Sequence, residues 1–124
     1  LNGGVGHDSL TGGAGDDFFR FNSIDANDSD TVVDFDAGDD KFQLDDAVLT
    51  GVVGSGGILT TAEFVSGAGT TTAATAAQRI IYNTTTGNLY YDADGSAGGS
   101  SAVLIATVGS STHPTLTFTD FLIV

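Results

Sequence analysis

The chain has 124 residues, enough for one domain, and carries 16 Asp and Glu against three Lys and Arg, for a net charge of −13. This charge argues against nucleic acid as a partner, since phosphate binding needs a basic face, and it disfavours an anionic membrane surface. There is no Cys to form a disulfide, and no stretch is apolar enough to span a membrane.

The acidic residues are concentrated near the start of the chain. Twelve of the 16 lie within residues 1–46, and all twelve are Asp. Such a density of one charge repels itself unless cations neutralise it. A merely solvated acidic face would mix Glu with Asp, yet Glu63 is the only Glu.

Residues 3–20 are two tandem copies of the nonapeptide G-G-x-G-x-D-x-U-x, where U is a large apolar residue. Leu1, Leu10 and Phe19 fall at one phase, so we expect an earlier repeat before Leu1. Each copy predicts a six-residue turn followed by a short strand. The glycines permit backbone conformations closed to residues with a Cβ, so the carbonyl oxygens of the turn can point at one centre. The alternative is a flexible Gly/Asp linker, which would not keep the nine-residue phase. The pattern matches the calcium-binding nonapeptide of the parallel β-rolls in RTX proteins.

Carbonyl and carboxylate oxygens are the ligands of a hard cation, and Ca²⁺ takes six to eight of them. One turn cannot supply that many, so two stacked turns are predicted to share an ion. Successive turns of a roll lie on opposite sides, so partner turns should be two repeats, or about 18 residues, apart. Turn 3–8 should then pair with residues 21–26, and turn 12–17 with about 30–35. The predicted metal ligands are Gly4, Gly6, Asp8, Gly13, Gly15, Asp17, Asn22, Asp25, Asp28 and Asp30.

Three short strands are predicted to follow the first turns. Phe19 and Phe21 alternate with Phe18 and Arg20, which indicates a strand with the first pair in the core. Further strands are predicted at 31–35 and 41–44.

The order "repeat, F-x-F, acidic loop, D-T-V-V-D-F, A-G-D-D-K-F-Q-L" resembles the end of the β-roll in serralysin-type metalloproteases and other RTX exoproteins. The resemblance implies an all-β fold, the end of a parallel β-roll capped by antiparallel strands, with at most one short helix. It also implies that Asp30 closes the last calcium site, which we expect to include Gly13, Gly15 and Asp17, and that Asp34 has a structural role. No H-E-x-x-H motif is present, and no catalytic site is predicted.

The middle of the chain is poor in charge. Residues 47–78 are expected to form a loop-rich connection, in which 60–65 can form one helical turn capped by Thr. We expect a mobile loop around 67–77.

Residues 79–92 predict a β-hairpin, with Ile80, Tyr82, Leu89 and Tyr91 facing one way. The D-x-D-G sequence that follows, from Asp92 to Gly95, resembles the start of an EF-hand loop but lacks the remaining ligands. Two interpretations stay open, a plain hairpin turn and a further ion site.

The last segment predicts a buried strand at 102–108 and an apolar end at 115–124. This region is similar to the C-termini of bacterial RTX proteins exported by type I secretion, which implies an uncleaved export signal. The alternative for residues 120–124 is an ordinary edge strand, and the two interpretations are compatible.

We therefore expect three parts within one compact domain: a roll end and cap (1–46), a connection (47–78) and a C-terminal unit (79–124). The expected function is a non-enzymatic domain that folds on Ca²⁺ after type I secretion and stabilises a larger exported bacterial protein. Its expected partners are calcium ions and the secretion machinery, with an extracellular or cell-surface location. The alternative is a calcium-dependent adhesin or surface-layer module that binds polysaccharide or another cell-surface ligand.

Overall fold

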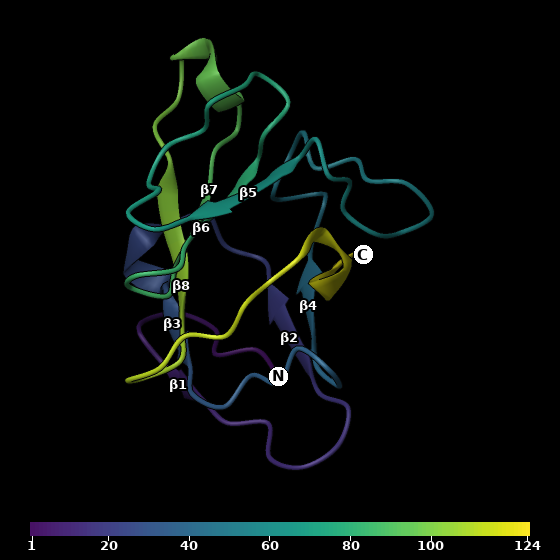
Figure 1. Ribbon diagram of the computed structural model, residues 1–124, viewed down its shortest axis with the longest axis vertical. Coiled ribbons are helices and arrows are strands. Elements are labelled where there is room, and N and C mark those ends of the chain that lie inside the picture. Colours follow the sequence, from purple (N-terminus) through teal and green to yellow (C-terminus); the bar gives the residue numbers. More distant parts are fainter.

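The computed structural model describes all of residues 1–124 and contains nine strands in two sheets (Figure 1). The strands are β1 (Ser9–Leu10), β2 (Phe18–Phe21), β3 (Asp30–Val32), β4 (Lys41–Leu44), β5 (Phe64–Gly67), β6 (Ile80–Asn83), β7 (Asn88–Tyr91), β8 (Val103–Val108) and β9 (Phe121–Ile123). The larger sheet has the order β1-β3-β8-β7-β6-β5 and the smaller β2-β4-β9. The helical segments are three single 3-10 turns, η1 (Ala26–Asp28), η2 (Gly95–Ala97) and η3 (Phe118–Asp120). The predicted all-β class is confirmed, and none of the helical segments could cross a bilayer.

Two parallel ladders form the roll. In the larger sheet β1, β3 and β8 run parallel, and in the smaller sheet β2, β4 and β9 do the same. Each coil of the roll gives one strand to each sheet, so β1 with β2, β3 with β4, and β8 with β9 are three successive coils. The C-terminal strands thus continue the roll that the repeats begin.

The segment with β5, β6 and β7 is inserted between the second and third coils. β6 and β7 form the predicted hairpin, in which Ile80 pairs with Tyr91 and Tyr82 with Leu89, and all four residues are buried. β7 then pairs antiparallel with β8, which joins the insertion to the larger sheet. Antiparallel strands therefore flank the roll, as the resemblance implied.

Aromatic rings stack through the core between the two sheets. Phe19, Phe42 and Phe121 are paired across the three coils and are fully buried. The Phe42 ring lies 4.2 Å from that of Phe35 and 5.1 Å from that of Phe121, between ring centroids. Pairs of this kind contribute about 0.5–1.5 kcal/mol beyond their buried area. The strand period explains the pattern, since Phe18 on the opposite face of β2 is 45% exposed.

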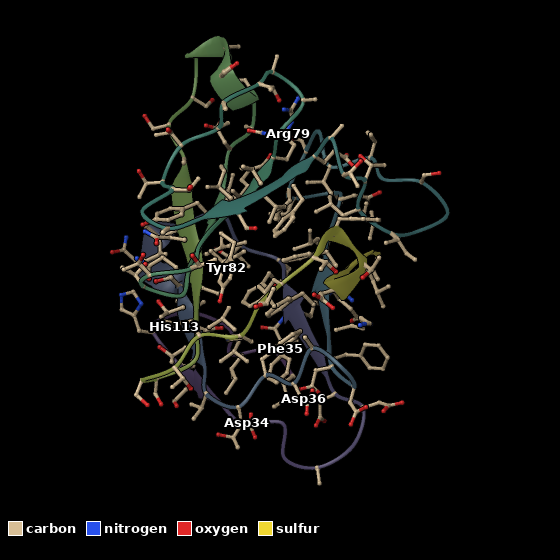
Figure 2. The ribbon with its side chains drawn as sticks, viewed as in Figure 1. Asp34, Phe35, Asp36, Arg79, Tyr82 and His113 are labelled. Atoms are coloured by element: carbon tan, nitrogen blue, oxygen red, sulfur yellow. The ribbon has the colours of Figure 1, made fainter.

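Tyr82 connects the inserted segment, which contains β5, β6 and β7, to the third coil. Its hydroxyl donates a hydrogen bond to the Pro114 carbonyl oxygen at 2.7 Å, and burial raises the pKa of Tyr82 to about 12. Figure 2 shows Tyr82 and Phe35 near the middle of the molecule, with Asp34 toward one end and Arg79 toward the other.

The predicted spacing of about 18 residues between stacked turns is wrong. Ser9 pairs with Thr31 and Phe18 with Lys41, so the turns before these strands contact residues 22 and 23 positions further on. The second coil is longer because its first loop is not a nonapeptide and contains η1. The extra residues of this loop shift the position of every later residue relative to the turns of the first coil.

The helical turn expected over 60–65 is not formed. Residues 60–63 form a turn, and β5 follows it directly. Glu63 explains the difference. Its buried carboxylate accepts hydrogen bonds from the N–H groups of Val53, Gly54 and Thr60. The side chain thereby binds a separate loop, and Phe64 and Val65 continue as a strand.

Candidate metal site at the stacked turns

The repeat glycines adopt the conformations that the turns require. Gly4, Gly6, Gly13 and Gly15 have φ between +90° and +104°, a region that residues with a Cβ rarely adopt. The two nonapeptides therefore fold into equivalent turns, 3–8 and 12–17.

The first turn is held by two carboxylates from the second coil. Asp28 accepts a hydrogen bond from the Gly6 N–H at 2.9 Å, and Asp30 accepts one from the Asp8 N–H at 3.0 Å. Asp30 is only 5% exposed and lies against Gly3, where a Cβ would stand 2.5 Å from its carboxylate. Gly3 is thus needed for the close approach of Asp30.

The second turn is held in the same way by Asp34 and Asp40. Asp34 accepts hydrogen bonds from the N–H groups of Gly12 and Gly13, each at 2.9 Å. Asp40 is 1% exposed and accepts from the N–H groups of Asp17 and Asp36 at 3.0 and 2.9 Å.

The expected grouping of Asp30 with Gly13, Gly15 and Asp17 is therefore wrong. Asp30 lies against the first turn, and Asp34 and Asp40 hold the second. The cause is the longer second coil, which shifts Asp30 by one turn. Asp40, absent from the predicted ligands, had a readable signal, because it directly precedes a strand just as Asp8 and Asp17 do.

Asn22 and Asp25 differ in how they relate to the first turn. Asn22 lines a cavity of about 10 Å³ together with Gly4, Asp28 and Asp30. This volume is about that of one water-sized sphere. Asp25 instead caps η1, and its Oδ1 accepts hydrogen bonds from the backbone and side-chain N–H groups of Asn27.

The most informative atoms are the Oδ2 oxygens of Asp8 and Asp17. Both are buried without a hydrogen-bond partner, at the same position of the two repeats. No cation of the protein lies beside them, because the two ion pairs in the structure are Arg20–Asp45 and Lys41–Asp120. A buried, unpaired carboxylate oxygen is costly, so its recurrence in both repeats calls for a partner.

The carboxylates around the turns also favour a bound cation. Burial raises the pKa of Asp30, and the nearby Asp8 and Asp28 carboxylates add to the rise. The pKa values of Asp28 and Asp34 are lowered by the turn N–H groups that donate to them. Three carboxylates, those of Asp8, Asp28 and Asp30, therefore lie close together at the first turn.

The donor set fits calcium in its chemistry, since it consists of carboxylate and peptide oxygens. No cluster of three or more Asp, Glu or His side chains could hold an ion unaided. Peptide carbonyls of the turns would have to complete the ligand set, and the glycine conformations leave that possible.

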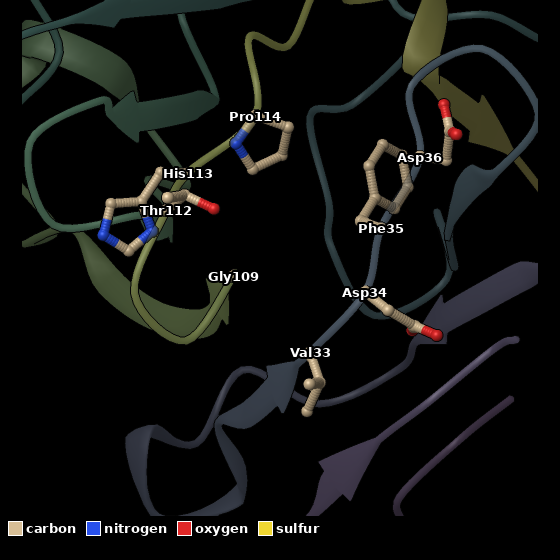
Figure 3. A pocket seen from close by; sticks show the side chains of 8 residues that line it. All are labelled: Val33, Asp34, Phe35, Asp36, Gly109, Thr112, His113 and Pro114. Carbon is tan, nitrogen blue, oxygen red and sulfur yellow. The ribbon is translucent and has the colours of Figure 1, made fainter.

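A larger hollow of about 320 Å³ lies between residues 33–36 and 109–114, where the second and third coils are stacked (Figure 3). Asp34 and His113 line it but point away from each other. The Asp34 carboxylate is engaged by the first coil, and His113 Nδ1 lies 2.7 Å from the Val108 carbonyl oxygen. These side chains do not converge on a common centre.

One family of known proteins matches the chain. The family described as "Peptidase M10 serralysin C terminal" matches residues 2–123. No curated protein matches. The match spans both sheets and all the turns described above, and it confirms the resemblance seen in the sequence.

Proposed function

The chain belongs to the serralysin C-terminal family, and on this basis we propose that it is a domain whose folding is driven by calcium after export from the cell. The family is an RTX-type C-terminal domain of secreted bacterial proteins, in a type I secretion context. The family name refers to a peptidase, and the C-terminal domain is the non-catalytic region of that peptidase. Beyond the family match, we propose which residues bind calcium, that calcium drives folding of this domain, and that the folded domain stabilises an attached exported protein.

The observation that carries the proposal is the pair of buried, unpartnered Oδ2 atoms of Asp8 and Asp17. A cation at each turn would supply the missing partner. The proposed ligands are these carboxylates, the peptide oxygens of the glycine turns (Gly4 and Gly6, Gly13 and Gly15), and Asp28, Asp30 and Asn22 beside the first turn.

The free energy expected from calcium binding is large enough to affect the stability of the fold. Extracellular calcium modules have dissociation constants of about 10⁻⁴–10⁻³ M. At about ten times the dissociation constant, one site adds about 1.4 kcal/mol to the free energy of unfolding. Two such sites add about 3 kcal/mol, against a total of about 5–15 kcal/mol for an ordinary domain. With little calcium inside the cell, the Asp-rich segment would repel itself and the chain would remain unfolded and suitable for export.

Circular dichroism with a calcium titration tests this proposal. We expect the melting temperature to rise with calcium in the wild type, and to rise much less in the variant Asp8→Asn/Asp17→Asn. The matched control is Asp39→Asn/Asp46→Asn, which removes the same charge from two exposed positions. A fold and melting temperature that do not respond to a chelator would rule the proposal out.

A further inference from the structure

Asn2 and Gly3 form the only Asn-Gly pair in the chain. In such a pair the main-chain nitrogen of the glycine can attack the side-chain amide carbon of the asparagine and close a five-membered ring. Reactions within one molecule gain from this proximity, and glycine has no Cβ to obstruct the attack. Each of the other asparagines precedes a residue that has a side chain: Asn22, Asn27, Asn83 and Asn88. The sequence therefore singles out Asn2 as the asparagine most prone to lose its side-chain amide.

The fold leaves this pair accessible and polarises the amide. Asn2 is exposed, so water can reach it. Its Oδ1 accepts a hydrogen bond from the Gly4 N–H at 2.9 Å. Attack on the amide carbon places negative charge on this oxygen, and a positioned N–H donor stabilises such a charge. The Gly3 nitrogen lies outside the strands and takes part in no backbone–backbone hydrogen bond, so ring closure breaks no strand pairing.

The only Asp-Gly pair, Asp94 and Gly95, shows the opposite arrangement. An aspartate can close the same ring, but Asp94 Oδ2 accepts hydrogen bonds from the N–H groups of Gly99 and Ser100 at 2.7 and 3.0 Å. Gly95 is buried in η2, where a Cβ would stand 2.6 Å from the Thr75 carbonyl oxygen. Both members of this pair are held in place, which disfavours ring closure there.

We propose that Asn2–Gly3 is a site of spontaneous deamidation in the folded protein. The Gly3 nitrogen bonds to the Asn2 amide carbon, and the bond from that carbon to Nδ2 breaks. Nδ2 leaves as ammonia, together with the proton that the Gly3 nitrogen gives up. Water then opens the ring at either of its two carbonyl carbons. One opening gives aspartate at position 2, and the other gives isoaspartate, in which the main chain runs through the side-chain carbons.

The modification acts on the contact between the first turn and the second coil. Asn2 Nδ2 donates a hydrogen bond to Asn22 Oδ1 at 3.1 Å, and both residues line the small cavity that also borders Asp28 and Asp30. Deamidation removes this donor and adds a negative charge beside two carboxylates. Isoaspartate also lengthens the main chain just before Gly3, which packs closely against Asp30. We therefore expect the products to loosen the first turn.

Peptide mapping by mass spectrometry measures the reaction at Asn2 alone. Tryptic cleavage after Arg20 releases residues 1–20, in which Asn2 is the only asparagine. The full chain is incubated at mildly alkaline pH with calcium present, so the test is valid whether or not calcium drives folding, and circular dichroism checks the fold. We expect residues 1–20 to gain the mass of the amide-to-acid change several-fold faster than residues 21–41, which contain Asn22 and Asn27. Similar rates in the two peptides, or a gain only after denaturation, would overturn the site.

The products identify the route. Ring opening predicts isoaspartate in residues 1–20, which an isoaspartyl methyltransferase labels, whereas direct hydrolysis of the amide gives aspartate alone and would contradict the ring. The matched variant is Asn2→Gln, which keeps an amide but needs a six-membered ring, and its peptide should gain no mass over the same period. Gly3→Ala is unsuitable, because its Cβ would stand 2.5 Å from the Asp30 carboxylate.

Thermal melting tests the effect on the first turn. After incubation the wild type should melt lower than fresh protein, while Asn2→Gln should keep its melting temperature. An equal fall in both proteins would place the damage elsewhere in the chain. A wild type that gains mass and melts unchanged would show that the modification leaves the turn intact. Either result contradicts the expected loosening.

Discussion

Glu63 shows how this protein holds a buried carboxylate without a cation. Its oxygens accept hydrogen bonds from the N–H groups of Val53, Gly54 and Thr60 and from the Thr60 hydroxyl, at 2.8–3.1 Å. Burial alone would raise the pKa of Glu63, but these donors outweigh it and the pKa is lowered from 4.5. Asp8 and Asp17 differ, because one oxygen of each has no donor. The comparison separates a carboxylate whose oxygens both accept hydrogen bonds from two that each keep one unpaired oxygen.

The variant Glu63→Gln should lower the free energy of unfolding by about 2 kcal/mol at pH 7, since hydrogen bonds to a charged group contribute about 1.5–3 kcal/mol. The folded pKa is depressed, so the contribution of Glu63 is present above the unfolded value of 4.5 and is lost as pH falls through the folded value. Urea unfolding of both proteins at pH 7 and near pH 3 measures this, with calcium constant and Asp46→Asn as the control. A difference that stays constant across this pH range would show that the charge of Glu63 is not the cause.

At the scale of elements, Asp120 joins the last strand to the roll. Its Oδ2 accepts a hydrogen bond from the Thr117 N–H at 2.7 Å in the capping box of η3, and its Oδ1 lies 3.2 Å from Lys41 Nζ on β4. Because Asp120 directly precedes β9 and is buried, these contacts set where the last strand meets the smaller sheet.

The variant Asp120→Asn should lower the free energy of unfolding by about 2 kcal/mol, since it weakens a cap and leaves Lys41 without its partner. The amides of β9 should exchange faster with solvent. Chemical denaturation and hydrogen exchange measure both effects. The matched control is Asp45→Asn, whose partner Arg20 is exposed, and its loss should be much smaller. Equal losses would mean that the Lys41–Asp120 pair has no special role in holding β9.

At the scale of the whole molecule, the charge of −13 opposes compaction, because twelve Asp lie within residues 1–46 and the chain has only three basic residues. Two ion pairs use two of these three residues. Relief of the repulsion must therefore come mainly from the solvent, either as specific cations or as screening.

Monovalent salt should therefore stabilise the calcium-free protein. Raising KCl from about 0.01 to 0.15 M shortens the screening length from about 30 to 8 Å. We expect the melting temperature in chelator to rise by several degrees, and the same salt step to have less effect with saturating calcium. Differential scanning calorimetry measures both, with Asp39→Asn/Asp46→Asn as a variant of reduced charge. If the melting temperature in chelator does not change with salt, charge repulsion does not limit the stability of the fold.

The parts of the fold that could be predicted depend on local geometry. The recurring glycines indicated the two turns because only glycine readily adopts their positive φ. The alternation of Phe19 and Phe21 with Phe18 and Arg20 predicted the burial of the first pair, and residues 79–92 predicted the β6–β7 hairpin. The concentration of carboxylate oxygens in residues 1–46 follows from residue type alone, while the calcium sites that they would form stay a prediction.

The parts that could not be predicted depend on which segments meet. A non-repeating loop with η1 lengthens the second coil, so Asp30 contacts the first turn and Asp34 and Asp40 hold the second. The segments 1–46 and 79–124 share both sheets through β8 and β9, while the three-part division of the chain stays a prediction.

By itself, then, the sequence determined the turns, the strand faces and the acidic oxygen chemistry, because φ preference, strand period and side-chain type act within a few residues. Only the tertiary structure decided the partners of the turns, the third coil and the place of the Asp92–Asp94 loop. Those features depend on loop lengths and on hydrogen bonds between residues more than 20 positions apart, which no local pattern encodes.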